Sequence, residues 1–103
     1  MKIFISQVMR DKTEQEIIEE RAYAIEQARR VYDGHQLEII DSYFEGYKPD
    51  GKRKALKYLA KSIELLADAD AVVFAPGWEN GRGCKIEQEC AKAYEIPRLY
   101  LTY

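Results

Sequence analysis

The stretch from Asp70 to Gly83 reads DAVVFAPGWENGRG and joins two contrasting segments. Its first part, Asp70–Ala75, is a short apolar run with two valines and a phenylalanine, which is typical of a buried central strand. Its second part, Pro76–Gly83, combines a proline with three glycines and predicts a loop. A helical pattern from about Cys84 to Tyr94 follows. A strand, a loop and a helix in this order are typical of one unit of a parallel α/β sheet.

The rest of the chain repeats this alternation. Lys2–Ser6 predicts a buried strand, and Thr13 with Glu16 three residues later has the pattern of a capping box. The helix that this box opens is expected to end near Asp33 and Gly34. The other expected elements are a strand at about Gln36–Ile40, a helix marked by apolar residues from Leu56 to Ala67, and a closing strand at Pro97–Leu101.

These elements predict one α/β domain over residues 1–103. Because strands and helices alternate, the sheet should be parallel, with helices on both faces. We expect a small Rossmann-like or flavodoxin-like three-layer sandwich with three main helices and a four-stranded parallel sheet in the order 2-1-3-4.

The composition excludes several classes of protein. Among the 103 residues, 16 are Lys or Arg and 18 are Asp or Glu, so the formal net charge of −2 argues against a nucleic-acid binder with an overall basic surface. No apolar run approaches the roughly 20 residues of a membrane span, and the first residues do not resemble a signal peptide. Cys84, Cys90 and His35 are too few for a structural zinc site, so we expect no metal and two reduced thiols in a cytoplasmic protein.

Functional residues are expected in three loops, because ligands of parallel α/β sheets bind beyond the carboxyl ends of the strands. The loops are Ser6–Arg10, Tyr43–Gly51 and Pro76–Gly83. No GxGxxG motif follows the first strand and the chain has no GxxxxGK[ST] motif, so we expect neither an ordinary dinucleotide site nor a cofactor. The third loop contains the glycines that allow positive φ and close backbone approach: Gly77, Gly81 and Gly83.

Several other residues near these loops suit a ligand. Trp78 is the single tryptophan, and it either stacks on a planar ligand or covers the sheet edge as a hydrophobic lid. Arg82, at the start of a helix, either meets a phosphate or carboxylate or is solvated, and Arg10 makes the tip of the first loop positive. Tyr58 and Ser62 lie one turn apart on the second helix and are expected to face the cleft.

Glu87 is the acidic residue with the most suggestive position. It lies on the third expected helix four residues after Gly83, with Cys90, Ala91 and Tyr94 on its side. The helix N-terminus favours its carboxylate form, whereas partial burial opposes that form. A nucleophile or a general base needs such an environment. The alternative is an ordinary surface or capping acid.

Three segments resemble the nucleoside 2-deoxyribosyltransferase superfamily: Ile3–Arg10, Ala67–Val73 and Gly83–Ala91. The chain is most similar to a group of short phage and bacterial proteins within that superfamily's fold, which share Ala75–Asn80 followed by Arg82–Cys84. The resemblance covers nearly the whole chain. It implies a nucleoside or nucleotide bound at the carboxyl edge of a Rossmann-like sheet.

The resemblance also implies a reaction. A glycine followed four residues later by a helical glutamate is the superfamily's pattern, and Gly83 and Glu87 match it. In the characterised enzymes that glutamate attacks the anomeric carbon of the sugar and releases the base. The sugar then passes to another base or to water, as in retaining glycosidases. Glu87 is therefore the expected catalytic residue.

The substrate-binding residues follow from the same resemblance and from the loops. We expect Ser6, Gln7 and Asn80 to orient the sugar. We expect Trp78 to stack on the base and Arg10 or Arg82 to bind a phosphate. The full set of expected binding residues is Ser6, Gln7, Met9, Arg10, Tyr58, Ser62, Pro76, Gly77, Trp78, Asn80, Gly81, Arg82 and Gly83.

The chain also departs from the superfamily. The enzymes usually carry an aspartate eight residues before the aspartate that precedes the third strand, and counting back from Asp70 places Ser62 there. A serine supplies no negative charge and accepts no proton as a carboxylate does. Val8 and Asp11 stand where relatives in the subgroup tend to have proline and glycine. Because the enzymes often complete each other's pockets as dimers, the resemblance also implies a homo-oligomer.

Three functions remain open at this point. The first is an enzyme that cleaves or transfers an N-glycosidic bond, a nucleoside deoxyribosyltransferase or a nucleotide N-glycosidase. The second is a catalytically inactive module that sequesters a nucleotide-derived signal, such as a phage-encoded sponge, and Ser62 favours it. The third is an interaction protein whose aromatic loop docks a partner chain. We expect no nucleic-acid or membrane partner.

Overall fold

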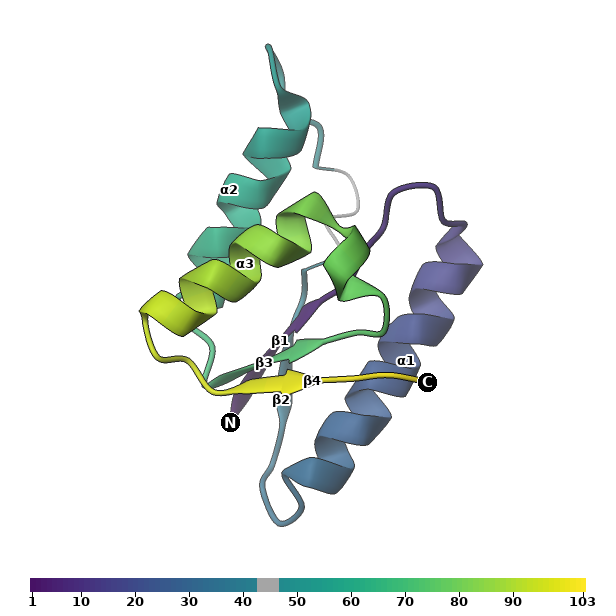
Figure 1. Cartoon of the computed structure of the whole chain (residues 1–103), viewed down its shortest axis with the longest axis vertical. Helices are drawn as coiled ribbons and strands as arrows, with labels where there is room; N and C mark the ends of the chain where they lie inside the picture. Colours follow the sequence, from purple (N-terminus) through teal and green to yellow (C-terminus); the bar gives the residue numbers. More distant parts are fainter. Residues whose placement is uncertain (43–46) are drawn as a thin grey trace.

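A four-stranded parallel sheet forms the middle layer of the protein, with α1 on one face and α2 and α3 on the other (Figure 1). The computed structural model describes residues 1–42 and 47–103. Its strand order is β2-β1-β3-β4, and every pairing is parallel. The predicted fold class and strand order are confirmed. The elements are β1 (Lys2–Ser6), α1 (Glu14–Val31), β2 (Glu38–Ile40), α2 (Lys54–Leu66), β3 (Ala71–Phe74), the 3₁₀ helix η1 (Trp78–Asn80), α3 (Arg82–Ala93) and β4 (Arg98–Tyr100).

The two central strands divide their side chains between two apolar layers, because successive residues of a strand point to opposite faces. The layer facing α1 contains Ile3, Ile5, Ala24, Ala28, Ala71, Val73 and Ala75. The layer facing α2 and α3 contains Phe4, Leu66, Val72, Phe74 and Ala91. Both faces of β1 and β3 are therefore buried, which explains why these strands are continuous apolar runs.

The capping box predicted for the first helix is present. Glu16 donates its backbone N–H to Thr13 Oγ1 at 3.1 Å, and Thr13 donates its own N–H to Glu16 Oε1 at 3.0 Å. These bonds satisfy two amides that the first turn leaves free. α1 ends at Val31, shortly before Gly34, whose φ is 89°.

The segment predicted as a loop after β3 is more regular than expected. Residues Trp78–Asn80 form a 3₁₀ turn, and α3 begins at Arg82, so the last two residues of the predicted loop are helical. Of the three glycines, Gly77 alone has a positive φ, of 82°. Gly81 is needed for close approach instead, since a Cβ there would lie 2.7 Å from Val8 Cγ2.

Two further expectations concern residues outside these elements. The first four residues of the predicted loop Tyr43–Gly51 lie outside the described residues. Among the helices of the described ranges, none is both long and apolar enough to cross a membrane.

Candidate functional site

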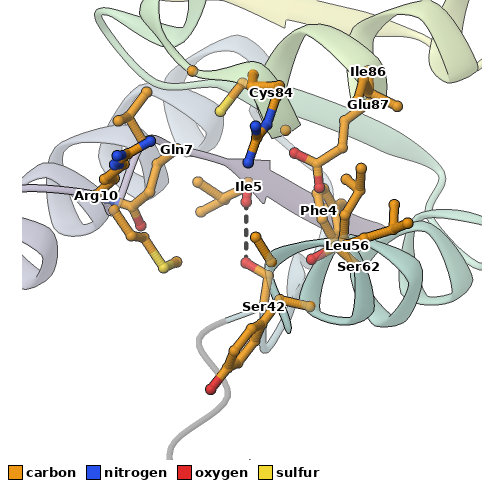
Figure 2. Close-up of a pocket in the computed structure, with 18 of the residues that line it drawn as sticks. Phe4, Ile5, Gln7, Arg10, Ser42, Leu56, Ser62, Cys84, Ile86 and Glu87 are labelled. Carbon is orange, nitrogen blue, oxygen red and sulfur yellow. Dashed lines mark hydrogen bonds between the residues drawn. The ribbon is translucent and has the colours of Figure 1, made fainter. Parts of the chain in front are cut away.

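A cavity of about 1220 Å³ lies at the carboxyl end of β1, between α2, the loop after β1 and the start of α3 (Figure 2). This is the sheet edge where the topology predicts a ligand. Its apolar walls include Phe4, Leu56 and Ile86, and its polar residues include Gln7, Arg10, Ser62 and Glu87. Such a volume is ample for a small organic ligand.

Glu87 reaches the cavity from the buried face of α3. This face carries Cys84, Glu87 and Ala91, whereas Tyr94, expected on the same side, is 81% exposed. The partner of Glu87 comes from β1. Because side chains alternate between the two faces of a strand, Ser6 points toward α3, and its hydroxyl donates a hydrogen bond of 2.7 Å to Glu87 Oε1. The carboxyl group is thus held at the end of β1.

Burial changes the acidity of this carboxyl group. Glu87 is 6% exposed, and loss of hydration raises its pKa from 4.5 to about 7, although the hydrogen bond from Ser6 opposes the rise. At neutral pH the group therefore exchanges between its acid and carboxylate forms. A residue that gains and loses a proton near pH 7 suits acid–base or nucleophilic chemistry.

Gln7 faces the other side of β1 and is also buried. Its Nε2 donates to the Ile17 carbonyl at 3.1 Å and to Glu20 Oε1 at 3.2 Å. Glu20 is in turn held by Lys12 Nζ at 2.8 Å. Because both partners of the amide are acceptors, its nitrogen must face α1, and Gln7 Oε1 is buried with no hydrogen-bond partner among residues 1–42 and 47–103.

The comparisons with known proteins give a family and no activity. A family model described as a domain of unknown function (DUF4406) matches residues 1–100. The chain belongs to the DUF4406 family. No curated protein and no solved structure matches this DUF4406 chain.

Ten of the fourteen site residues expected from the sequence line the cavity of this DUF4406 member. They are Gln7, Met9, Arg10, Tyr58, Ser62, Asn80, Gly81, Arg82, Gly83 and Glu87. Ser6 is not among the described residues that line the cavity, and its hydroxyl donates a hydrogen bond to the Glu87 carboxyl group. This contact holds Glu87 in place, and the expected role of Ser6 in orienting a sugar stays a prediction.

The remaining three residues, Pro76, Gly77 and Trp78, are not among the described residues that line the cavity. The indole of Trp78 packs at centroid distances of 5.2 Å from Phe74 and 5.3 Å from Tyr100. These two rings stack on each other because Phe74 and Tyr100 are register partners in β3 and β4. Trp78 therefore covers the sheet edge, and this placement favours the lid over the stacking wall.

The structure adds lining residues that sequence reasoning missed, among them Ser42, Lys48 and Arg53. The Ser42 hydroxyl donates to the Ile5 carbonyl at 3.0 Å, which fastens the chain after β2 to β1 (Figure 2). Arg53 has a φ of 54° and is the N-cap of α2. The basic run Lys52–Lys54 just before a helix was the signal that could have found it.

Thiol chemistry and metal binding have less support in this DUF4406 member. Cys84 is a free thiol against Ser6 and Glu87, and burial raises its pKa to about 11, so it is a neutral thiol at physiological pH. In residues 1–42 and 47–103, no three His, Cys, Asp or Glu side chains gather closely enough to hold a metal ion. Asp11 has a φ of 62°, a left-handed conformation that glycine adopts more readily than aspartate.

Proposed function

We propose that this DUF4406 member binds a nucleoside or nucleotide in the cavity and cleaves or transfers its N-glycosidic bond, with Glu87 as nucleophile. The observation that carries the proposal is the placement of Glu87: a buried carboxyl group held by Ser6 at the wall of a ligand-sized cavity. Among the described lining residues it is the single carboxylate. The resemblance of Gly83–Ala91 to the nucleoside 2-deoxyribosyltransferase superfamily supports the same role.

The proposed reaction has two displacements. A carboxylate oxygen of Glu87 forms a bond to the anomeric carbon, and the carbon–nitrogen bond breaks with its electron pair leaving on the base, which takes a proton from water. Water or an acceptor base then attacks the same carbon, loses a proton, and releases the carboxylate. The net reaction with water yields free base and free sugar.

The other lining residues would bind and orient the ligand. Asn80, at the end of η1, and Tyr58, on α2, line the cavity, and the Tyr58 hydroxyl, which donates to the Tyr47 carbonyl at 2.6 Å, can still accept a hydrogen bond. Arg10, in the loop after β1, and Arg82, at the start of α3, line the cavity and would bind a phosphate. Gln7 would contact the sugar through its unpartnered oxygen.

A binding protein without the reaction is the second candidate, and Ser62 favours it. Ser62 lines the cavity at the position where the superfamily's enzymes carry an aspartate, and no second carboxylate stands among the described lining residues. The leaving base would then receive no proton from a side-chain carboxyl group other than Glu87. Such a protein would hold its ligand intact, as a sponge does.

One chromatographic experiment separates these functions. The protein is incubated with deoxynucleosides, their 5′-monophosphates and NAD-derived nucleotides, and the filtrate is analysed after the protein is removed. We expect a new free-base peak with at least one substrate. A ligand that leaves the filtrate and returns intact after heat denaturation would identify a sponge. An unchanged filtrate across the panel would refute both functions and favour the protein-interaction hypothesis.

Two finer expectations belong with this proposal. We expect a cytoplasmic protein, because the free thiols Cys84 and Cys90 suit a reducing compartment. We also expect a homo-oligomer by resemblance to the superfamily. Sedimentation of the purified chain tests the second expectation.

A further inference from the structure

Basic side chains gather around the cavity although the whole chain has a net charge of −2. Four of the lining residues are cationic: Arg10, Lys48, Arg53 and Arg82. In the part of the chain that the structure describes, none of the four has an ion-pair partner. Among the described lining residues the single carboxylate, Glu87, is buried and hydrogen-bonded. The cavity therefore offers an excess of positive charge to a ligand.

Two helices begin at this cavity with their first amides uncapped. α2 starts after Arg53 and α3 starts after Gly81, and neither has a side-chain cap or an acidic residue in its first turn. α1, in contrast, has a complete capping box and two glutamates in its first turn. The uncapped amides add to the field of the arginines and favour an anion at each helix start.

Gln7 gives independent evidence that the cavity holds an organic ligand. Its side chain is 8% exposed and lines the cavity, and its Oε1 has no hydrogen-bond partner in the described part of the chain. A 180° rotation of the amide would place its oxygen next to the Ile17 carbonyl and the Glu20 carboxylate, which are themselves acceptors. A buried acceptor without a partner is costly, so the bound ligand should place a donor there. Phosphate groups offer mainly acceptors, whereas sugar hydroxyls and base amines are donors.

We propose that the ligand is a nucleotide with two or more phosphate groups, which lie between Arg53 at the start of α2 and Arg82 at the start of α3 while its sugar or base donates a hydrogen bond to Gln7 Oε1. This inference rests on the proposed function and narrows its substrate class. It excludes plain nucleosides as the preferred ligand. It also assigns to Arg53 a binding role that the sequence did not suggest.

Calorimetric titration of the full chain tests this assignment. The probes are adenosine, guanosine, cytidine and thymidine, each with its 5′-monophosphate and 5′-diphosphate. For the base that binds, we expect the diphosphate to bind at least about tenfold more tightly than the nucleoside, with the monophosphate between them. The affinity advantage of the diphosphate over the nucleoside should shrink when the concentration of sodium chloride is raised, because exposed charges are screened.

Matched variants locate the phosphates. Arg53→Gln and Arg82→Gln should each weaken diphosphate binding at least about fivefold and change nucleoside binding less than about twofold. Arg29→Gln, in the last turn of α1 at the opposite edge of the sheet, is the control and should change neither. Gln7→Met, checked for folding by circular dichroism, should weaken nucleoside and diphosphate binding by the same factor.

The outcomes also separate this inference from the proposed reaction. Equal affinities for nucleoside and diphosphate, equal losses for both ligands in Arg53→Gln and Arg82→Gln, or no binding by any probe would overturn the inference. Release of free base from nucleosides without a phosphate advantage would overturn it and leave the reaction standing. Tighter diphosphate binding without base release would uphold it and refute the reaction.

Discussion

Glu87→Gln is expected to lower turnover by about a thousandfold or more while it leaves ligand affinity within about threefold. Glutamine keeps the shape of the side chain and can still accept the hydrogen bond from Ser6, which is 2.7 Å long in the protein. Its neutral amide is a poor nucleophile, so the first displacement at the anomeric carbon stops. The loss should therefore fall on kcat and not on binding.

Single-turnover release of free base measures this effect, and Glu89→Gln is the matched control. Glu89 lies on the exposed face of the same helix, so its replacement removes one carboxylate from α3 without touching the cavity. The control should retain the activity of the unaltered protein. A Glu87→Gln variant with more than about a tenth of the normal rate would remove Glu87 from the mechanism.

The same substitution is expected to stabilise the protein at alkaline pH. The folded state raises the pKa of Glu87 from 4.5 to about 7, chiefly through burial, so between these values the folded chain binds more protons than the unfolded chain. The contribution of Glu87 to stability is therefore present at low pH and is lost as the pH rises from about 4.5 through 7. The full loss amounts to at most about 3 kcal/mol.

Denaturant unfolding at pH 5 and pH 8 checks this expectation. Because glutamine never ionises, the free energy of unfolding of Glu87→Gln relative to the unaltered protein should be higher at pH 8 than at pH 5, by about 1 to 3 kcal/mol. Glu89→Gln, measured at the same two pH values, is the matched control. A Glu87→Gln difference that is the same at both pH values would mean that the carboxyl group is not buried in solution as it is in the structure.

Together the two results would show that Glu87 accelerates the reaction and lowers the stability of the folded protein. A buried carboxylate with one hydrogen-bond partner is poorly solvated, and a structural role would be served as well by a neutral side chain. A residue that lowers the stability of its own fold is expected at a functional site. Measurements of stability and of activity on Glu87→Gln therefore test the same interpretation, that Glu87 serves the function and not the fold.

Much of the fold could be predicted because the signals are local. The apolar runs of β1 and β3 and the capping box of α1 each depend on residues within a few positions of one another. Alternation of these elements was enough to predict the sheet order. The start of α3 at Arg82 was misjudged, because glycine and arginine next to a turn carry little helical signal of their own.

The site was predicted less completely, because its contacts depend on tertiary placement. Ser6 lies at the carboxyl end of β1, as expected, but its contact with Glu87 depends on the face of β1 that α3 covers. Trp78 contacts Tyr100 because β4 pairs with β3, and no sequence pattern near Trp78 predicts that pairing. Arg53 lines the cavity because α2 begins there, with the left-handed conformation of a residue that is not glycine.

A covalent bond between Glu87 and the sugar is the most direct consequence of the proposed function. The protein is mixed with the substrate found by chromatography, quenched in acid within one turnover, and examined by intact mass and peptide mapping. We predict a mass increase equal to the bound glycosyl group, located on the peptide that contains Glu87 and absent from Glu87→Gln. Base release at the full rate with an unmodified Glu87 peptide would contradict the covalent mechanism.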